Sequence, residues 1–216
     1  MSEAGQTPSA GPDLVVWTIG HSNHPLEKLL GLVEEQQIGV LVDVRSSPYS
    51  KYASHFDRES LQEALRTRNV QYLFLGDQLG GRPEGDEFYD KEGYVRYDRL
   101  AQSPGFQQGA ERLLRGIASH RVAIVCGEED PTHCHRRLLL GRVLGRRGVR
   151  VLHIRGDGRV QSEEELAAEE EFHKTKGQLS LFDTEDTEAW RSTQSVSPRK
   201  APPSSSAHSA SVESAD

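Results

Sequence analysis

Val122-Ala-Ile-Val-Cys-Gly-Glu-Glu-Asp-Pro-Thr-His-Cys-His-Arg136 runs from an apolar segment, through a polar loop, into an arginine-rich amphipathic segment. The short apolar run predicts a buried strand over 121–125, and the periodic pattern that follows predicts a helix over 135–147. Strand, loop and helix in this order form the repeating unit of α/β domains. Both cysteines of the chain, Cys126 and Cys134, lie within this unit.

The same alternation extends on both sides of this stretch. Continuous apolar runs are typical of strands that are buried on both faces of a parallel sheet. We therefore expect an α/β fold, with a mostly parallel sheet of about five strands and helices on both faces. The segment 84–98 is predicted to be irregular. The other expected strands are 14–19, 38–45, 70–75 and 149–154, and the other helices are 25–35, 57–68 and 104–119.

Composition divides the chain into segments. Residues 1–13 and 183–216 are rich in Ser, Pro, Ala or acidic residues and are expected to be disordered, because they bury too little apolar surface. Residues 14–160 form the predicted α/β domain. Ser162-Glu-Glu-Glu165 is a capping box that opens an acidic helix, so 161–177 is expected to be helical.

Charge and cysteine content limit the classes of protein. The net charge is −7, and the 12 acidic and 5 basic residues after Gln161 account for all of it. Charge thus argues neither for nor against nucleic acid binding. Two cysteines are too few for a disulfide scaffold, and no apolar run reaches the length of a membrane span. We expect a cytoplasmic protein without a membrane partner, and no cofactor is implied. The oligomeric state is left open.

Five short motifs lie in order along the chain. They are Thr18-Ile-Gly-His-Ser22, Leu41-Val-Asp-Val-Arg-Ser-Ser-Pro48, Leu79-Gly-Gly81, Cys126-Gly-Glu128 and Cys134-His-Arg136. With these motifs in this order, the chain resembles the domain-of-unknown-function 488 family, and the resemblance spans about residues 17–155. It implies an α/β fold with a site at the motifs, and no particular reaction.

The two cysteines are the strongest candidates for chemistry. Cys126 ends a strand, and Cys134 opens a helix, where the dipole and the unpaired N–H groups stabilise a thiolate. We predict catalytic roles for both cysteines and for His135, with Glu128 as an acid or base. Alternatively, Cys126 is a buried core residue, and Glu128 only caps the next helix.

Three uses of the cysteine pair remain open. One cysteine can act as a nucleophile with a histidine base, or the pair can cycle between dithiol and disulfide. The pair can also bind zinc together with one histidine. Because the spacing between the cysteines is not a common zinc-finger spacing, we predict no metal. The candidate third zinc ligands are His21, His133 and His135.

Polar residues after the first two strands predict an anion site. His21, a further catalytic candidate, follows Gly20, and Asp43 and Arg45 alternate at a strand end, so both point to one face. A turn-stabilising histidine and a structural ion pair are the competing interpretations. Arginine favours phosphate groups as ligands. The predicted anion- or substrate-binding residues are Ser22, Asp43, Arg45 and Arg136.

A second arginine cluster follows on the helix over 135–147. Arg142, Arg146, Arg147 and Arg150 lie close together in sequence. A solvated helix face and a track for a phosphate backbone both explain such a row.

Gln178-Leu-Ser-Leu-Phe182 resembles the pentapeptide that binds the bacterial sliding clamp. The glutamine amide can bond at the rim of a pocket while leucine and phenylalanine fill an apolar groove. The alternative is a segment that folds back onto the domain. The predicted partner is therefore the sliding clamp, bound through 178–182, with DNA or a nucleotide as the substrate. The residues assigned to clamp binding are Gln178, Leu179, Leu181 and Phe182.

These features lead to three functional hypotheses. The first is a DNA-associated enzyme, linked to repair or replication and recruited by the sliding clamp, with a Cys/His/Arg anion- or nucleotide-binding site. The second is a cysteine-based sulfur or redox enzyme without a DNA role. The third is a non-catalytic binding module or adaptor whose motifs serve only the fold.

Overall fold

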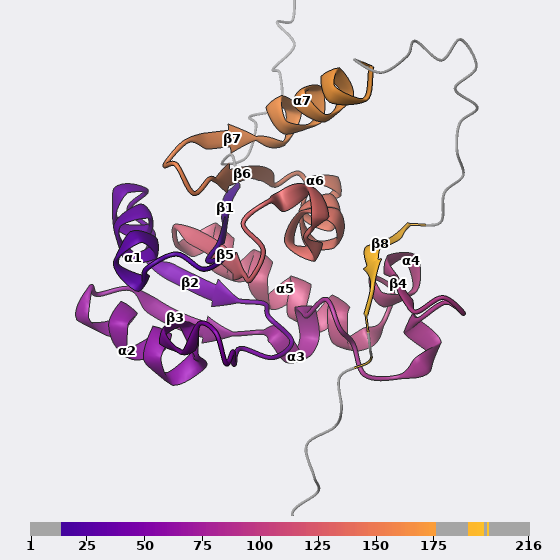
Figure 1. Ribbon diagram of the computed structural model, residues 1–216, viewed down its shortest axis with the longest axis horizontal. Helices are drawn as coiled ribbons and strands as arrows, with labels where there is room; N and C mark the ends of the chain where they lie inside the picture. The colour runs from indigo at the N-terminus through magenta and orange to yellow at the C-terminus, as the bar shows by residue number, and fades with distance from the viewer. Residues whose placement is uncertain (1–13, 176–189, 197, 199–216) are drawn as a thin grey trace, which may run out of the picture.

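The predicted α/β fold is confirmed in a computed structural model, which describes residues 14–175, 190–196 and 198. The six strands of the main sheet have the order β3-β2-β5-β1-β6-β7 (Figure 1). The first five are mutually parallel, and β7 is antiparallel to β6. Their bounds are β1 (Val15–Gly20), β2 (Val40–Asp43), β3 (Gln71–Phe74), β5 (Val122–Cys126), β6 (Arg150–Ile154) and β7 (Val160–Ser162).

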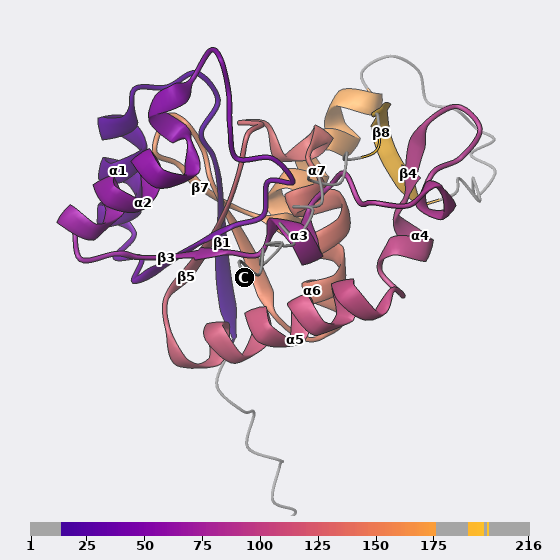
Figure 2. The same cartoon turned by 90° about the horizontal axis from the view of Figure 1, so that it is seen from below.

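Helices cover both faces of this sheet, as predicted. Figure 2 shows α1 and α2 on one side of the strands and α5 and α6 on the other. Neighbouring strand residues point to opposite faces. Trp17 accordingly belongs to the α1/α2 core, and Val16 belongs to the α5/α6 core. The helices are α1 (Leu26–Glu35), α2 (Arg58–Thr67), α5 (Pro104–Ser119) and α6 (Arg142–Arg146), which continues the π-helical turn η4 (Arg136–Gly141).

The segment that was predicted to be irregular, 84–98, contains regular elements. Its strand β4 (Tyr94–Arg96) pairs in antiparallel fashion with β8 (Arg191–Ser195). Figure 1 shows this pair beside α4, at the end of the molecule away from α1 and α2. The remaining short elements are η1 (Ser54–Phe56), α3 (Gly76–Leu79), η2 (Asp86–Phe88), α4 (Tyr97–Leu100) and η3 (Pro131–His133).

The expectation that the chain after 183 is disordered is wrong for 190–196. Trp190 anchors this segment through an edge-to-face contact with Tyr97, at 6.2 Å between ring centroids. Its indole Nε1 donates to the carbonyl of Leu138 (2.8 Å), and the guanidinium of Arg142 lies 4.7 Å from the ring centroid. One partly buried aromatic ring and a strand pairing thus hold in place a segment whose polar composition predicts no ordered structure.

Two predictions fall outside the described residues. These are the clamp-binding pentapeptide 178–182 and the N-terminal segment 1–13. In the described part of the chain, no helix combines the length and the apolar character that a membrane crossing requires.

The acidic helix α7 (Glu163–Thr175) follows directly after β7. Ser162 and Glu165 exchange the two hydrogen bonds of a capping box, at 2.8 and 3.1 Å. Apolar docking is limited, since Leu166 is buried while Phe172 is 57 % exposed. Glu163 instead fixes the helix to the domain, because its carboxylate accepts from Arg137 (2.8 Å) and lies 3.0 Å from His153 Nε2.

The docking of α7 on the domain should therefore depend on pH. Burial opposes the shift, but His153 and Arg137 lower the pKa of Glu163. A lowered carboxyl pKa gives stabilisation that is complete above the unfolded value and is lost as the pH falls through the folded one. We expect amide hydrogen exchange in 163–173 to accelerate as the pH falls below about 4, after correction for intrinsic rates. In the variant Glu163→Gln, the same amides should exchange fast already at neutral pH, because the carboxylate that holds the helix is gone.

Candidate functional site

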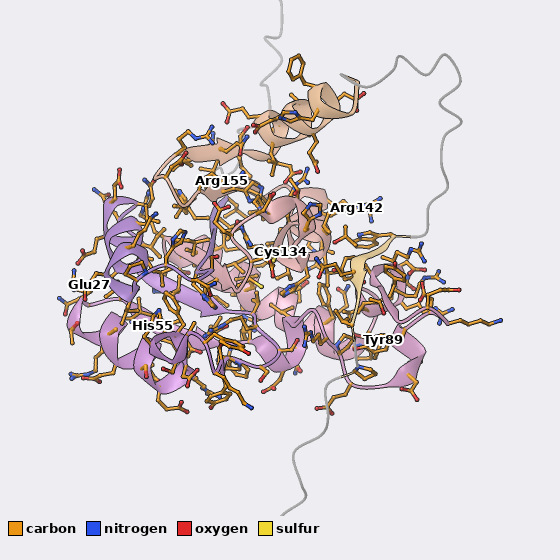
Figure 3. The ribbon with its side chains drawn as sticks, viewed as in Figure 1. Glu27, His55, Tyr89, Cys134, Arg142 and Arg155 are labelled. Carbon is orange, nitrogen blue, oxygen red and sulfur yellow. The ribbon has the colours of Figure 1, made fainter. Side chains whose placement is uncertain are left out.

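The carboxyl ends of β1, β2 and β5 border a pocket of about 460 Å³. The loop after β5, the turn η3 and the start of η4 form another part of its wall. In Figure 3, Cys134 is labelled near the middle of the molecule, between the sheet and α6. The pocket brings together six of the predicted site residues: His21, Arg45, Cys126, Glu128, Cys134 and His135.

Two sulfurs and one imidazole nitrogen form the centre of the pocket. The Nδ1 atom of His135 lies 3.6 Å from the Sγ of Cys126 and 3.9 Å from the Sγ of Cys134. All three atoms lie within 4.8 Å of one another, and both cysteines are free and buried. We call these three residues the sulfur–imidazole centre.

The ring of His135 is held from two sides. Its Nε2 lies 3.1 Å from the carbonyl oxygen of Val44 and donates to it, which leaves Nδ1 for the sulfurs. A methyl group on Gly81 would lie only 2.7 Å from His135 Cγ, so the glycine backbone packs directly against the ring. The close approach explains why glycine is required here. The Gly-Gly motif therefore positions the histidine, in addition to making a turn.

The two thiols differ in acidity. The hydrogen bond with Cys134 and burial raise the pKa of Cys126 well above its ordinary value. Burial also opposes ionisation of Cys134, but the hydrogen bond from Cys126, the adjacent imidazole of His135 and the charge of Arg136 lower the pKa of Cys134 well below its usual range. The pair is thus arranged as a thiolate that accepts a hydrogen bond from a thiol.

Asp43, Arg45 and His21 form a buried chain of contacts beside this centre. Asp43 Oδ2 accepts from Arg45 Nη2 (2.6 Å), and Oδ1 accepts from Arg45 Nε (2.9 Å). Arg45 Nη1 donates to His21 Nε2 (3.1 Å), and Tyr72 donates to Asp43 (2.7 Å). Arg45 is a pocket residue, whereas Asp43 is fully buried behind it. Asp43 therefore orients Arg45 and does not contact a ligand.

His21 has both ring nitrogens engaged. Its Nδ1 donates to the carbonyl of Ser22 (2.8 Å), and Nε2 accepts from Arg45. Burial lowers the pKa of His21 to about 4, so the ring is neutral at neutral pH. The ring also stacks on Phe56, with the centroids 4.4 Å apart. These contacts make His21 a group that positions Arg45, and they leave no free ring nitrogen for the catalytic role that we predicted.

Besides Asp43, two further predicted anion ligands, Arg136 and Ser22, do not line the pocket. Arg136 is fully buried, and its guanidinium donates to the carbonyls of Glu128 and Glu129 and to the hydroxyl of Thr18. Ser22 lies in a turn with a positive φ of 44°, and its amide donates to Gly127. The anion-binding role of Arg136 is therefore corrected to a structural one, since its donors are used within the loop.

The exposed carboxylate of Glu128 lines the pocket, while its backbone is packed against β1. A methyl group on Gly20 would lie 1.8 Å from the carbonyl oxygen of Glu128.

We expect Gly20→Ala to displace this loop and to lower the free energy of unfolding by about 1–3 kcal/mol, as overpacking does. Urea denaturation measures the effect. Gly31→Ala in α1, where no atom lies within 4 Å, is the matched control and should not destabilise.

The sequence analysis missed several pocket residues. Arg82 and Tyr97 line the pocket, and so do Ser192, Thr193 and Gln194 of β8. Arg82 directly follows the Leu-Gly-Gly motif in sequence, so this position could have indicated a pocket residue. No sequence signal pointed to β8, because its contribution depends on pairing with β4.

The arginine row has internal partners. Arg142 and Arg146 lie over the ring of Trp190, and Arg147 pairs with Glu111 (2.8 Å). These contacts give three of the four arginines partners within the protein, and they favour neither a bare solvated face nor a continuous phosphate track.

Comparison with known proteins gives one match. The family model described as "Domain of unknown function DUF488" matches residues 25–143. The matched range includes four of the five motifs of the sequence analysis and ends before β6, while Thr18–Ser22 precedes it. No curated protein and no solved structure is significantly similar to the chain.

Proposed function

Because the chain belongs to the DUF488 family, whose description states no activity, we propose a function from the site itself. The protein is proposed to be an enzyme that acts on a phosphate-bearing substrate, such as a nucleotide or the end of a nucleic acid. The sulfur–imidazole centre is its reactive group. The convergence of two thiols, one imidazole and one arginine from distant segments on a single pocket carries this proposal.

The polar lining of the pocket supports an anionic substrate. Arg45 is held by Asp43 and lines the pocket, and Arg82 adds a second guanidinium. Arginine binds phosphate with paired hydrogen bonds. The N-terminal end of η4 also directs its positive dipole end toward Cys134. Glu128 is the one carboxylate among the described pocket residues, and it is placed to accept or deliver a proton.

Complementation of a deletion strain tests the enzymatic proposal. We expect Cys126→Ala, Cys134→Ala and His135→Ala to lose the cellular function under DNA damage, because each removes part of the centre. His120→Ala is the control, since His120 is exposed after α5 and does not line the pocket. If both cysteine variants complement fully, the protein is not an enzyme of this kind, and the adaptor hypothesis is favoured.

Binding of inorganic phosphate and of nucleoside phosphates, followed by thermal shift, tests the substrate class. We expect these ligands to raise the melting temperature of the protein. Arg82→Ala should weaken their apparent affinity at least tenfold. Arg66→Ala on α2 is the control, because Arg66 is exposed and remote from the pocket. Equal effects of the two variants would contradict an anion site in the pocket.

A dithiol enzyme is a second candidate, favoured by the hydrogen-bonded sulfur pair. The Cys134 thiolate would attack a disulfide substrate, breaking its S–S bond and releasing one thiolate. Deprotonated Cys126 would then attack the Cys134 sulfur, release the second thiolate and leave a Cys126–Cys134 disulfide. Two electrons pass from the protein to the substrate. Mass spectrometry should then detect an intramolecular disulfide after incubation with a small disulfide.

Recruitment to DNA is proposed from the pentapeptide alone. Gln178–Phe182 lies between α7 and β8 in sequence, outside the described residues. We expect a sliding-clamp pull-down to lose this protein when Leu181 and Phe182 are both changed to alanine. Phe172→Ala, at an exposed position of α7, is the control. If the clamp still retains the double variant, the proposed recruitment to DNA through 178–182 is wrong. Point variants are preferable to a truncation before Gln178, because the truncation would also remove β8 from the pocket.

A further inference from the structure

We propose that Cys126, Cys134 and His135 bind a thiophilic divalent metal ion, of the Zn²⁺ type, with a fourth position open to the pocket. This inference deepens the proposed function, on which it rests for the identity of the reactive centre. It names a cofactor for that centre and replaces the prediction of no metal. That prediction relied on zinc-finger spacing, which does not apply where a strand end and a helix start meet through the fold.

The distances among the three side chains suit a tetrahedral ion. With Zn–S bonds of about 2.3 Å and Zn–N bonds of about 2.0 Å, tetrahedral geometry places S and N about 3.5 Å apart. The observed separations from His135 Nδ1 are 3.6 Å to Cys126 and 3.9 Å to Cys134. All three ligand atoms lie within 4.8 Å of one another, so side-chain rotation is enough to bring them around one ion.

The second ring nitrogen of His135 is hydrogen-bonded in the way that is common for metal-binding histidines. A metal-binding histidine usually donates its other ring N–H to a carbonyl or carboxylate, which fixes the tautomer. His135 Nε2 donates to Val44, so Nδ1 presents its lone pair to the sulfurs. Gly81 blocks movement of the ring on another side.

The donor set and its location indicate the kind of ion and its use. Two thiolates and one imidazole favour Zn²⁺ over the hard ions Mg²⁺ and Ca²⁺. Sites with three protein ligands leave a position for water or substrate, whereas structural zinc sites are closed by four. All three residues line the pocket, so an added ligand can reach the ion from the side of Arg45 and Glu128. A phosphate oxygen bound there would be polarised by the metal.

Cobalt substitution tests the site directly. The reduced full-length protein is titrated with Co²⁺ alone, and the spectrum is recorded. We expect one equivalent to give thiolate-to-cobalt charge-transfer absorption and the strong visible bands of tetrahedral Co²⁺, which Zn²⁺ then displaces. Absence of charge transfer, or a spectrum of octahedral Co²⁺, would overturn the inference.

Variants assign the ligands. Cys126→Ser, Cys134→Ser and His135→Ala should each weaken Co²⁺ binding at least a hundredfold, whereas His133→Ala should bind as the unchanged protein does. Gly81→Ala should weaken binding by about 10–100-fold by shifting the ring of His135, and Gly145→Ala, which has open space, is its control. Circular dichroism confirms that each variant is folded. If His135→Ala and His133→Ala bind equally, the assignment is wrong. Because the readout is metal and not activity, this inference and the proposed function can fail separately.

Discussion

Replacing Arg136 with methionine should lower the free energy of unfolding by about 3–5 kcal/mol, or prevent folding altogether. Arg136 is fully buried and its guanidinium holds the carbonyls of Glu128 and Glu129 together with the hydroxyl of Thr18. Each buried acceptor that loses its donor costs about 1–3 kcal/mol. Methionine fills much of the space but donates no hydrogen bond, so the loop after β5 loses its anchor.

Urea denaturation and two companion variants make this prediction specific. Arg136→Lys should recover little of the loss, because one ammonium group cannot reach two carbonyls with the fork geometry of a guanidinium. Arg150→Met is the control, since Arg150 is exposed on β6, and we expect a change within about 0.5 kcal/mol. A destabilisation below about 1 kcal/mol for Arg136→Met would show that the loop does not depend on this side chain.

Replacing Asp43 with asparagine should destabilise the protein by a similar amount, about 3–5 kcal/mol. The carboxylate is fully buried and accepts from three atoms of Arg45 as well as from Tyr72. Without it, the charge of Arg45 remains in the protein interior with a neutral partner. Breaking one member of a buried ion pair is costly for this reason.

A double-mutant cycle separates the charge from the position. Arg45→Met in the Asp43→Asn background should restore part of the stability, because it removes the uncompensated charge. It should not restore phosphate binding, since Arg45 is the part of the pair that faces the pocket. Additive losses of stability in the double variant would contradict a buried, coupled pair. Glu63→Gln, at an exposed ion pair on α2, is the surface control.

The main sheet was largely accessible from sequence. Each of the five predicted parallel strands is present, because a continuous apolar run reports burial on both faces of the sheet. The capping box at Ser162 was readable for a similar reason, since its two hydrogen bonds join residues three positions apart. The strand order was not readable, because it depends on which distant runs pair with one another.

The candidate site was only partly readable. The motifs after β1, β2 and β5 indicated the correct edge of the sheet, since the carboxyl ends of parallel strands share it. The same motifs predicted a ligand-binding role for Arg136 and a catalytic role for His21, because residue type does not reveal which polar atoms are already bonded within the fold. Arg82 and β8 were missed, since their place at the pocket comes from loop packing and strand pairing.

The sequence by itself determined the local conformations, because periodicity and capping depend on neighbours along the chain. It also determined the edge of the sheet at which the reactive side chains lie. Only the tertiary structure decided that His135, 91 positions from Val44, turns one nitrogen to that carbonyl and the other to two sulfurs. It also decided that Arg136 points inward and that β8 closes against β4. These choices depend on contacts between segments far apart in the chain, and such contacts leave no periodic trace in either partner.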